Sequence, residues 1–190
     1  MDQKNDTEFF DRDVQEVAKD LLGKVLEHRV EEGGVWLSVR IIETEAYYGQ
    51  GDRGSHASLG FTEKRKALFM DAGTIYMYYS RAGDSLNFTC AGRRGDAVLI
   101  KSGYPSNDSP DMLAKMQVLN PLKSKSTPRP SERLCNGQSL LCKSLGLKVK
   151  DWDCQRLRSD RFRLVLSREH EVQPPSEIIQ TTRLGIPKGE

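Results

Sequence analysis

The sequence predicts an α+β fold in which helices surround an antiparallel β-sheet. Three features indicate this fold: an apolar stripe with helical spacing near the N-terminus, a succession of short β-rich segments, and a Gly-Gly turn between the first two of them. Strands joined by hairpins form an antiparallel sheet, whose apolar face needs helices to cover it. We expect a single domain over residues 1–190, with residues 1–7 as a flexible tail, because no linker divides the 190-residue chain.

The first element is a predicted helix at residues 14–22. Its apolar residues recur three and four positions apart and form one face: Val14, Val17, Ala18, Leu21 and Leu22. Asp13, with Glu16 three residues later, resembles a capping box, and Gly23 suits the position just after a helix, where positive φ is common. This helix is the best-defined element in the sequence.

The remaining elements follow from β propensity and turn residues. Residues 24–30 and 35–46 are predicted strands on either side of a turn in which Gly33 and Gly34 permit positive φ. The other expected strands lie at 74–79, 86–90, 97–101 and 162–166, the expected helices at 111–119 and 140–145, and the expected loops at 103–110 and 121–131.

The composition excludes several classes of protein. No apolar run approaches the ~18 residues needed to cross a bilayer, and the polar N-terminus is unlike a signal peptide. The four cysteines are too few and too scattered for a disulfide scaffold, and neither they nor the three histidines have the spacing of a metal site. The phosphate-binding and nucleophile-elbow motifs are also missing. We therefore expect a soluble intracellular domain with no metal.

The near-neutral net charge of +2 conceals an uneven distribution. Residues 1–50 carry 6 Lys and Arg against 12 Asp and Glu, whereas residues 115–168 carry 13 against 4, a net charge of +9. A basic stretch of this kind indicates a surface for a polyanion. The alternative is that helix faces and loops simply expose these charges to water.

Acidic and aromatic residues alternate at the end of the second predicted strand. Because successive strand residues point to opposite faces, Glu43, Glu45 and Tyr47 share one face while Ile42 and Ala46 share the other. If the apolar face packs on the core, the acids face a cleft or solvent, near a following loop that carries a histidine. Glu45 is then a candidate general base acting on water. The alternative is an ordinary half-exposed edge strand with surface acids.

Tyrosines form a second candidate site in the third predicted strand. Tyr76 and Tyr78 share one face, whereas Tyr79 points the other way. Aromatic faces can stack on a nucleobase, at about 1–3 kcal/mol per base. Tyrosines that pack at the edge of a core have the same pattern, so these residues alone leave both interpretations open.

A family resemblance connects the two candidate sites. The chain resembles the alkyladenine (3-methyladenine) DNA glycosylases of the mammalian type. The matching segments are residues 8–11 (EFFD), 21–26 (LLGKVL), 42–47 (IETEAY), 55–57 (SHA), 73–78 (GTIYMY), 86–87 (LN), 97–100 (AVLI), 134–142 (LCNGQSLLC) and 182–186 (TRLGI). The resemblance implies a compact single domain built on a curved, barrel-like antiparallel sheet surrounded by helices.

The resemblance also implies an activity. Such enzymes flip alkylated or deaminated purines, of the 3-methyladenine or hypoxanthine type, out of double-stranded DNA and hydrolyse the N-glycosidic bond. It implies a monofunctional DNA N-glycosylase that needs no metal or cofactor and acts as a monomer. Such a protein is cytoplasmic and nucleoid-associated in bacteria, or nuclear in eukaryotes.

Specific roles follow from the resemblance for five residues. Glu45 matches the general base that activates water, and Tyr47 matches the tyrosine that stacks on the flipped base. His56 and Tyr78 match the residues on the opposite face of that base. Asn87 matches the asparagine that excludes undamaged guanine by crowding its exocyclic amine.

The sequence differs from the family pattern in three places. Arg81 or Tyr79 stands near the position of the tyrosine that wedges into the DNA, and the spacing from Tyr78 to Asn87 is one residue short. Lys101 replaces an arginine that helps to hold the water, keeping the charge but losing the planar fork. The chain also ends soon after residues 182–186, where relatives usually continue into another aromatic-rich strand.

Two alternative functions are compatible with these departures. The first is a catalytically weakened relative that still binds nucleic acid, for which the altered wedge and Lys101 are the reasons. The second is a hydrolase of free nucleosides, which the basic stretch disfavours because a small substrate needs no extended cationic surface.

Overall fold

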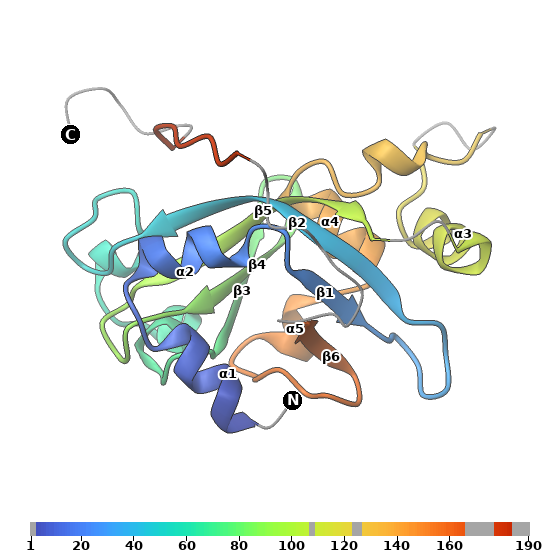
Figure 1. Cartoon of the computed structure of the whole chain (residues 1–190). Coiled ribbons are helices and arrows are strands. Elements are labelled where there is room, and N and C mark those ends of the chain that lie inside the picture. The colour runs from blue at the N-terminus through green and yellow to red at the C-terminus, as the bar shows by residue number, and fades with distance from the viewer. Residues whose placement is uncertain (1–2, 107–108, 123–126, 166–176, 184–190) are drawn as a thin grey trace.

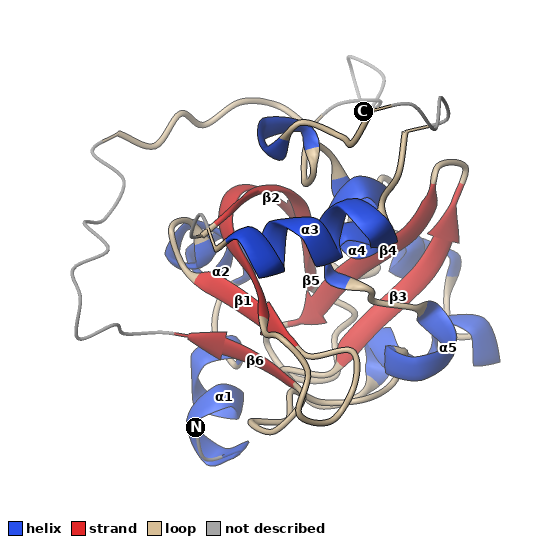
Figure 2. Cartoon of the chain, turned by 90° about the vertical axis from the view of Figure 1, so that its right-hand side faces the viewer, coloured by secondary structure: helices blue, strands red, loops and turns tan. Residues whose placement is uncertain are grey.

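The computed structural model describes residues 3–106, 109–122, 127–165 and 177–183. It is a single compact α+β domain with a curled six-stranded antiparallel sheet that forms a half-barrel (Figures 1 and 2). The strand order is β3-β4-β5-β2-β1-β6. This arrangement confirms the predicted fold class.

All six predicted strands are present. The strands are β1 (Val25–His28), β2 (Leu37–Tyr47), β3 (Ile75–Ser80), β4 (Gly83–Thr89), β5 (Ala97–Pro105) and β6 (Phe162–Val165). Residue 166, the predicted end of the last strand, lies outside the described residues. Each neighbouring pair is antiparallel, including β1 with β6, which are far apart in sequence.

Helices cover the half-barrel. The α-helices are α1 (Gln3–Phe10), α2 (Val14–Leu21), α3 (Pro110–Leu119), α4 (Gln138–Leu145) and α5 (Val149–Trp152), and the 3-10 helices are η1 (His56–Leu59), η2 (Glu63–Phe69) and η3 (Ser131–Arg133). Helix α2 packs on β2, while α4 packs on β4 and β5. No helix within the described ranges is long and apolar enough to cross a membrane.

Helix α2 begins as its sequence predicts. The Asp13 carboxylate accepts hydrogen bonds from the backbone N–H groups of Gln15 (2.9 Å) and Glu16 (3.3 Å), which otherwise have no partner in the first turn. Gly23 follows the helix with a φ of 81°. The apolar stripe is buried at Val14, Val17, Ala18 and Leu21.

Helix α1 ends at Phe10, which is fully buried and stacks on Phe88 with ring centroids 4.9 Å apart; that residues 1–7 form a flexible tail stays a prediction. One segment differs from the expectation for a local structural reason. The expected loop 103–110 instead begins as strand, because β5 pairs with β2 as far as Pro105, and it ends in the first turn of α3. A strand partner outweighs the local turn signal here.

A close approach of neighbouring backbone explains why β5 contains a glycine, Gly103. A β-carbon at this position would lie 2.9 Å from the Arg40 carbonyl oxygen and would also clash with Val39. Its N–H donates to the Cys135 carbonyl at 3.0 Å. The glycine therefore marks a close approach of backbones, not a loop.

One buried histidine ties β1 to the helical layer. His28 is 2% exposed, lies edge-on against Trp152 and Phe162, and its Nδ1 donates to the Leu145 carbonyl at 2.6 Å. That carbonyl is one of the groups left without a helical partner at the end of α4. Burial lowers the pKa of His28 to about 4, although the hydrogen bond to Leu145 opposes the shift.

Protonation of this histidine is expected to lower the stability of the domain on mild acidification. The folded pKa of about 4 lies below the ordinary value of 6.5, so the unfolded chain binds more protons between these two pH values. We expect the free energy of unfolding to drop by roughly 3 kcal/mol from pH 6.5 to pH 4 on account of His28 alone. Urea unfolding of the wild type and His28→Leu at pH 7, 5.5 and 4 measures this contribution. Equal pH slopes in both proteins would contradict it.

Candidate active site

The register of the sheet places four residues in one row across four strands. Glu45 on β2 pairs with Leu99 on β5, Leu99 pairs with Asn87 on β4, and Asn87 pairs with Tyr76 on β3. Directly paired residues in a sheet point to the same face. All four are buried, although they lie on the face opposite the main core, which receives their strand neighbours such as Val98. The fold therefore brings both candidate sites to one face.

Glu45 lies at one end of this row, and both of its carboxylate oxygens are engaged. Oε1 lies 3.0 Å from Lys101 Nζ, and Oε2 accepts a hydrogen bond of 2.7 Å from the Tyr47 hydroxyl. The Glu45 side chain is 8% exposed and that of Lys101 is 24% exposed. Burial, together with the hydrogen bond to Glu45, raises the pKa of Tyr47, so this hydroxyl remains a proton donor at neutral pH.

A double irregularity in the β2–β5 ladder produces this ion pair. Between the pairs Ile41–Gly103 and Thr44–Ile100 the register shifts twice, which leaves Ile42 and Lys101 outside the pairing. Bulges of this kind redirect side chains and are frequent beside active sites. Here the Lys101 ammonium group reaches the carboxylate of Glu45.

The same irregularity corrects the predicted faces of β2. Simple alternation placed Ile42 with Ala46 and Glu43 with Glu45. The structure instead leaves Ile42 55% exposed and Glu43 exposed, while Ala46 packs against the core and Glu45 is buried. The prediction holds after the bulge and fails at it, because alternation assumes an uninterrupted pleat.

His56 joins the tyrosines of β3 from the short helix η1. The Ser55 hydroxyl caps this helix by accepting from Ala57 N–H at 3.1 Å. His56 Nδ1 lies 2.9 Å from the Tyr76 hydroxyl, and its ring meets Tyr78 edge-on with centroids 4.6 Å apart. Burial, and to a lesser degree the charge of Arg65, lowers the pKa of His56, which favours the neutral imidazole at pH 7.

The two tyrosines themselves stack. The ring centroids of Tyr76 and Tyr78 are 5.5 Å apart, with 28° between the planes. Tyr76 is 3% exposed and belongs to a small apolar cluster with Ala57, Ala67 and Leu68 beneath η1 and η2. Tyr76 therefore holds His56 and Tyr78 in place. The sequence analysis named Tyr76 as a candidate for stacking on a base, but it did not predict this positioning role.

The Asn87 side chain connects strands β4 and β3. It is 4% exposed, and its Nδ2 donates to the Tyr76 carbonyl at 3.1 Å. The side chain is thus oriented by the neighbouring strand and lies in the same row as Glu45.

Tyr79 and Arg81 lie at the β3–β4 hairpin. Ser80 pairs with Gly83, so Arg81 occupies the two-residue turn. Tyr79 is 68% exposed and Arg81 is also exposed. Both candidates for the DNA wedge are therefore accessible at the surface.

Two residues that the sequence analysis did not assign to the site also contact it. Arg183 donates through Nη1 to the Ala46 carbonyl at 3.1 Å and through Nη2 to Asp52 Oδ1 at 2.7 Å, and its Cζ lies 4.4 Å from the centre of the Tyr47 ring. Asp52 and Arg183 are 131 positions apart. Only the fold brings them together, so no local pattern indicates this contact.

The basic stretch 115–168 does not form one free cationic surface. Several of its charged groups serve the fold: Arg129, Arg156 and Arg161 donate to backbone carbonyls, Arg163 pairs with Glu27, and Lys148 pairs with Asp84. Lys123, Lys125 and Arg168 lie outside the described residues. Part of the +9 charge is therefore structural, which weakens the interpretation of the stretch as a continuous binding surface.

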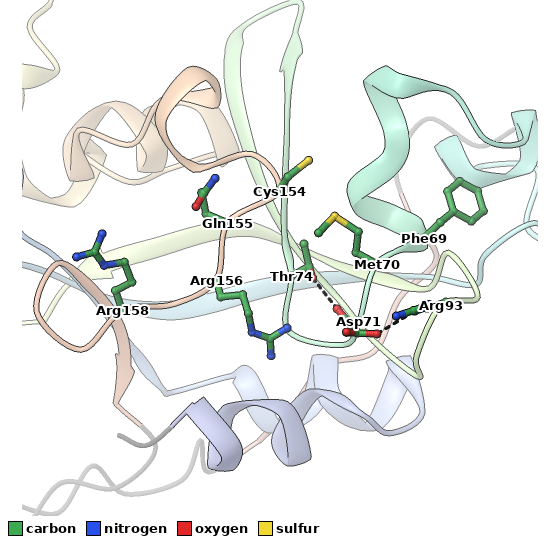
Figure 3. A pocket seen from close by; sticks show the side chains of 9 residues that line it. All are labelled: Phe69, Met70, Asp71, Thr74, Arg93, Cys154, Gln155, Arg156 and Arg158. Carbon is green, nitrogen blue, oxygen red and sulfur yellow. Dashed lines mark hydrogen bonds and ion pairs between the residues drawn. The ribbon is translucent and has the colours of Figure 1, made fainter.

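The structure also contains a pocket away from these residues. Its volume is about 550 Å³, and Figure 3 shows the side chains that line it: Phe69, Met70, Asp71, Thr74, Arg93, Cys154, Gln155, Arg156 and Arg158. Asp71 and Arg93 form an ion pair of 2.9 Å at its edge. None of the predicted site residues lines this pocket. Across the described part of the chain, no three His, Cys, Asp or Glu residues are grouped to hold a metal ion.

A buried carboxylate beside aromatic rings is suited to a hydrolytic enzyme whose substrate carries a planar ring. Comparison with known families specifies the class: residues 8–190 match the model of methylpurine-DNA glycosylase. The chain belongs to this family. The resemblance found in the sequence is thereby confirmed, and so is the enzyme class, a DNA N-glycosylase.

Relatives from bacteria are similar over most of the chain. A protein of Pseudomonas fluorescens is 59% identical over 184 residues, which cover 95% of this chain and 76% of the relative. One from Pseudomonas aeruginosa PAO1 is 58% identical over the same share of this chain and 73% of its own length. A protein of Anaeromyxobacter is 45% identical over 100 residues, about half of either chain. All three bear the name "Putative 3-methyladenine DNA glycosylase".

Proposed function

We propose that the protein removes alkylated or deaminated purines, of the 3-methyladenine or hypoxanthine type, from double-stranded DNA by hydrolysis of the N-glycosidic bond. The observation that carries this proposal is the buried Glu45 carboxylate, held by Lys101 and Tyr47 on the sheet face that also bears Tyr76 and Asn87. Membership in the methylpurine-DNA glycosylase family and the names of the relatives support the same activity.

In this proposal the damaged base leaves the duplex before the reaction. A glycosidic bond inside stacked DNA is out of reach, so the nucleotide is flipped, and the exposed hairpin residue Arg81 or Tyr79 enters the gap. Tyr47 stacks on one side of the base, while His56 and Tyr78 face its other side. Each stacked base gains about 1–3 kcal/mol, which offsets part of the cost of unstacking.

The reaction then needs one general base. The Glu45 carboxylate accepts a proton from water as the water oxygen attacks the anomeric carbon, and the electrons of the breaking C–N bond remain with the base. An N-alkylated purine is cationic and leaves as a neutral molecule, so it needs little acid assistance. A deaminated purine leaves without this advantage, and its release is expected to be slower.

Lys101 has no nucleophilic role in this mechanism. Its Nζ lies 3.0 Å from Glu45 Oε1, so the side chain is engaged with the general base. It instead orients the carboxylate and balances its charge. The products are therefore the free base and an abasic site in an uncut strand, as expected of a monofunctional glycosylase. We propose that the protein acts as a monomer.

Single-turnover assays test the proposal directly. Wild-type protein in excess over duplexes that carry 3-methyladenine or hypoxanthine is expected to release free base and leave a strand that breaks only after alkali treatment. Binding is expected to weaken as salt rises, because cationic side chains displace counterions from phosphates. Salt-sensitive binding without release from any lesion would contradict the proposed activity and identify the chain as a binding relative.

A further inference from the structure

The segment 177–183 contributes a side chain to the candidate active site through Arg183. In Figure 1 this segment, coloured red, passes above β2 and β5. The Arg183 side chain is 22% exposed and that of Asp52 is 12% exposed, so the ion pair between them is largely removed from water. Within the candidate site, Arg183 contacts Ala46 and Tyr47.

The guanidinium group makes three contacts at once. One nitrogen donates to the Ala46 carbonyl and to Asp52, the other donates to Asp52, and the flat cation lies over the Tyr47 ring. A cation over an aromatic face contributes about 0.5–2 kcal/mol, more when it is shielded from water. A planar fork can join a carboxylate, a carbonyl and a ring in this way, whereas an ammonium group cannot.

Asp52 links this contact to the loop that leads to His56. Its carboxylate also accepts hydrogen bonds from the backbone N–H groups of Tyr48 (3.0 Å) and Gly54 (2.9 Å). Burial opposes the ionisation of Asp52, but the Arg183 guanidinium and these N–H groups outweigh it and hold the pKa of Asp52 below its usual range. The pair is therefore a carboxylate–guanidinium pair at neutral pH, and Asp52 fixes the turn after β2.

We propose that Arg183, with Asp52 as its counter-ion, is a positioning residue that holds the Tyr47 ring so that its hydroxyl meets Glu45 and only one ring face is open to a base. This inference rests on the proposed function. Arg183 covers one face of Tyr47, so a base that stacks on this ring must use the other. Without Arg183 the ring is free to turn, and the hydrogen bond of 2.7 Å from its hydroxyl to Glu45 is no longer enforced.

The kinetic test compares two substitutions at Arg183 with a matched control. Arg183→Met keeps an unbranched apolar stem but loses the fork and the charge, and we expect it to lower the single-turnover rate at saturating enzyme about tenfold. Arg183→Lys is expected to recover less than half of that loss. Arg93→Met removes an exposed ion pair of similar type with Asp71 and is expected to stay within about twofold of the wild type.

Three outcomes of the kinetic test overturn the proposal. They are a wild-type rate in Arg183→Met, full recovery in Arg183→Lys, and an equal loss in Arg93→Met. The first shows that the position of Tyr47 does not depend on Arg183. The second shows that charge alone matters, and the third that any lost ion pair has the same effect.

Hydrogen exchange tests the positioning without reference to catalysis. The amides of Tyr48 and Gly54 donate to Asp52, so Arg183→Met is expected to speed their exchange at least about fivefold, while exchange in β4 stays unchanged. If the wild type releases no base, the proposed activity fails, and the exchange result still decides whether Arg183 orders this region. If the wild type is active and exchange is the same in both proteins, the positioning role alone is wrong.

Discussion

Glu45→Gln is expected to reduce base release about 10²–10⁴-fold while DNA binding stays within a few-fold of the wild type. The amide has nearly the same shape as the carboxylate and can still accept the hydrogen bond from the Tyr47 hydroxyl, but it cannot take a proton from water. Single-turnover release of free base and a binding titration with the same lesion duplex measure the two effects separately.

Glu43→Gln is the matched control for this experiment. Glu43 lies on the same strand two residues earlier, but it is exposed. Its substitution by glutamine removes the same negative charge as Glu45→Gln. Its substitution is expected to leave base release within about twofold of the wild type, since exposed charges contribute little. Equal losses in the two variants, or an unchanged rate in Glu45→Gln, would show that Glu45 is not the general base.

Lys101→Met is expected to lower base release about tenfold to a hundredfold and to destabilise the domain by about 1–3 kcal/mol. The Glu45 carboxylate then loses its cationic partner while it remains 8% exposed, and an unpaired buried charge is costly. The cost stays below that of a fully buried pair because Lys101 is 24% exposed. Misplacement of the carboxylate lowers the rate by disturbing its alignment with the attacking water.

Two further variants show whether the Lys101→Met effect comes from the lost charge at this position. Lys101→Arg restores the charge and is expected to recover most of the rate and of the stability, measured by urea unfolding at pH 7. Lys115→Met removes an exposed lysine that forms a 2.8 Å ion pair with Glu31 and is expected to change neither. A normal rate in Lys101→Met would mean that Glu45 needs no partner at this position.

The strands were predictable because each strand carries its own local pattern. Segments such as Thr74–Tyr79 combine β-branched and aromatic residues and are bounded by turn residues, so their conformation is largely a local property. Helix α2 was predictable for the same reason, since its cap, its stripe and its final glycine all lie within eleven residues of one another. Helices α1 and η1 lack a repeated apolar stripe, and among their described side chains one in each is fully buried, Phe10 and Ala57.

The candidate site was predictable only in part. The types of residue at Glu45, Tyr47, His56 and Tyr78 indicated chemistry, and the resemblance to a family supplied a role for each. The bulge that leaves Ile42 exposed and brings Lys101 to Glu45 arises from the pairing of β2 with β5, two strands that are far apart in the sequence. No pattern within either strand reports such a register.

The α+β class, the membership of the family and the candidacy of Glu45 as general base could all be inferred from the sequence, because these inferences depend on residue type and local order. The tertiary structure alone decided which contacts surround that acid: Lys101 across a bulge, Tyr76 in the same sheet row, and Arg183 over Tyr47. These contacts join segments that are distant along the chain, and their geometry follows from strand register and from the packing of the whole domain.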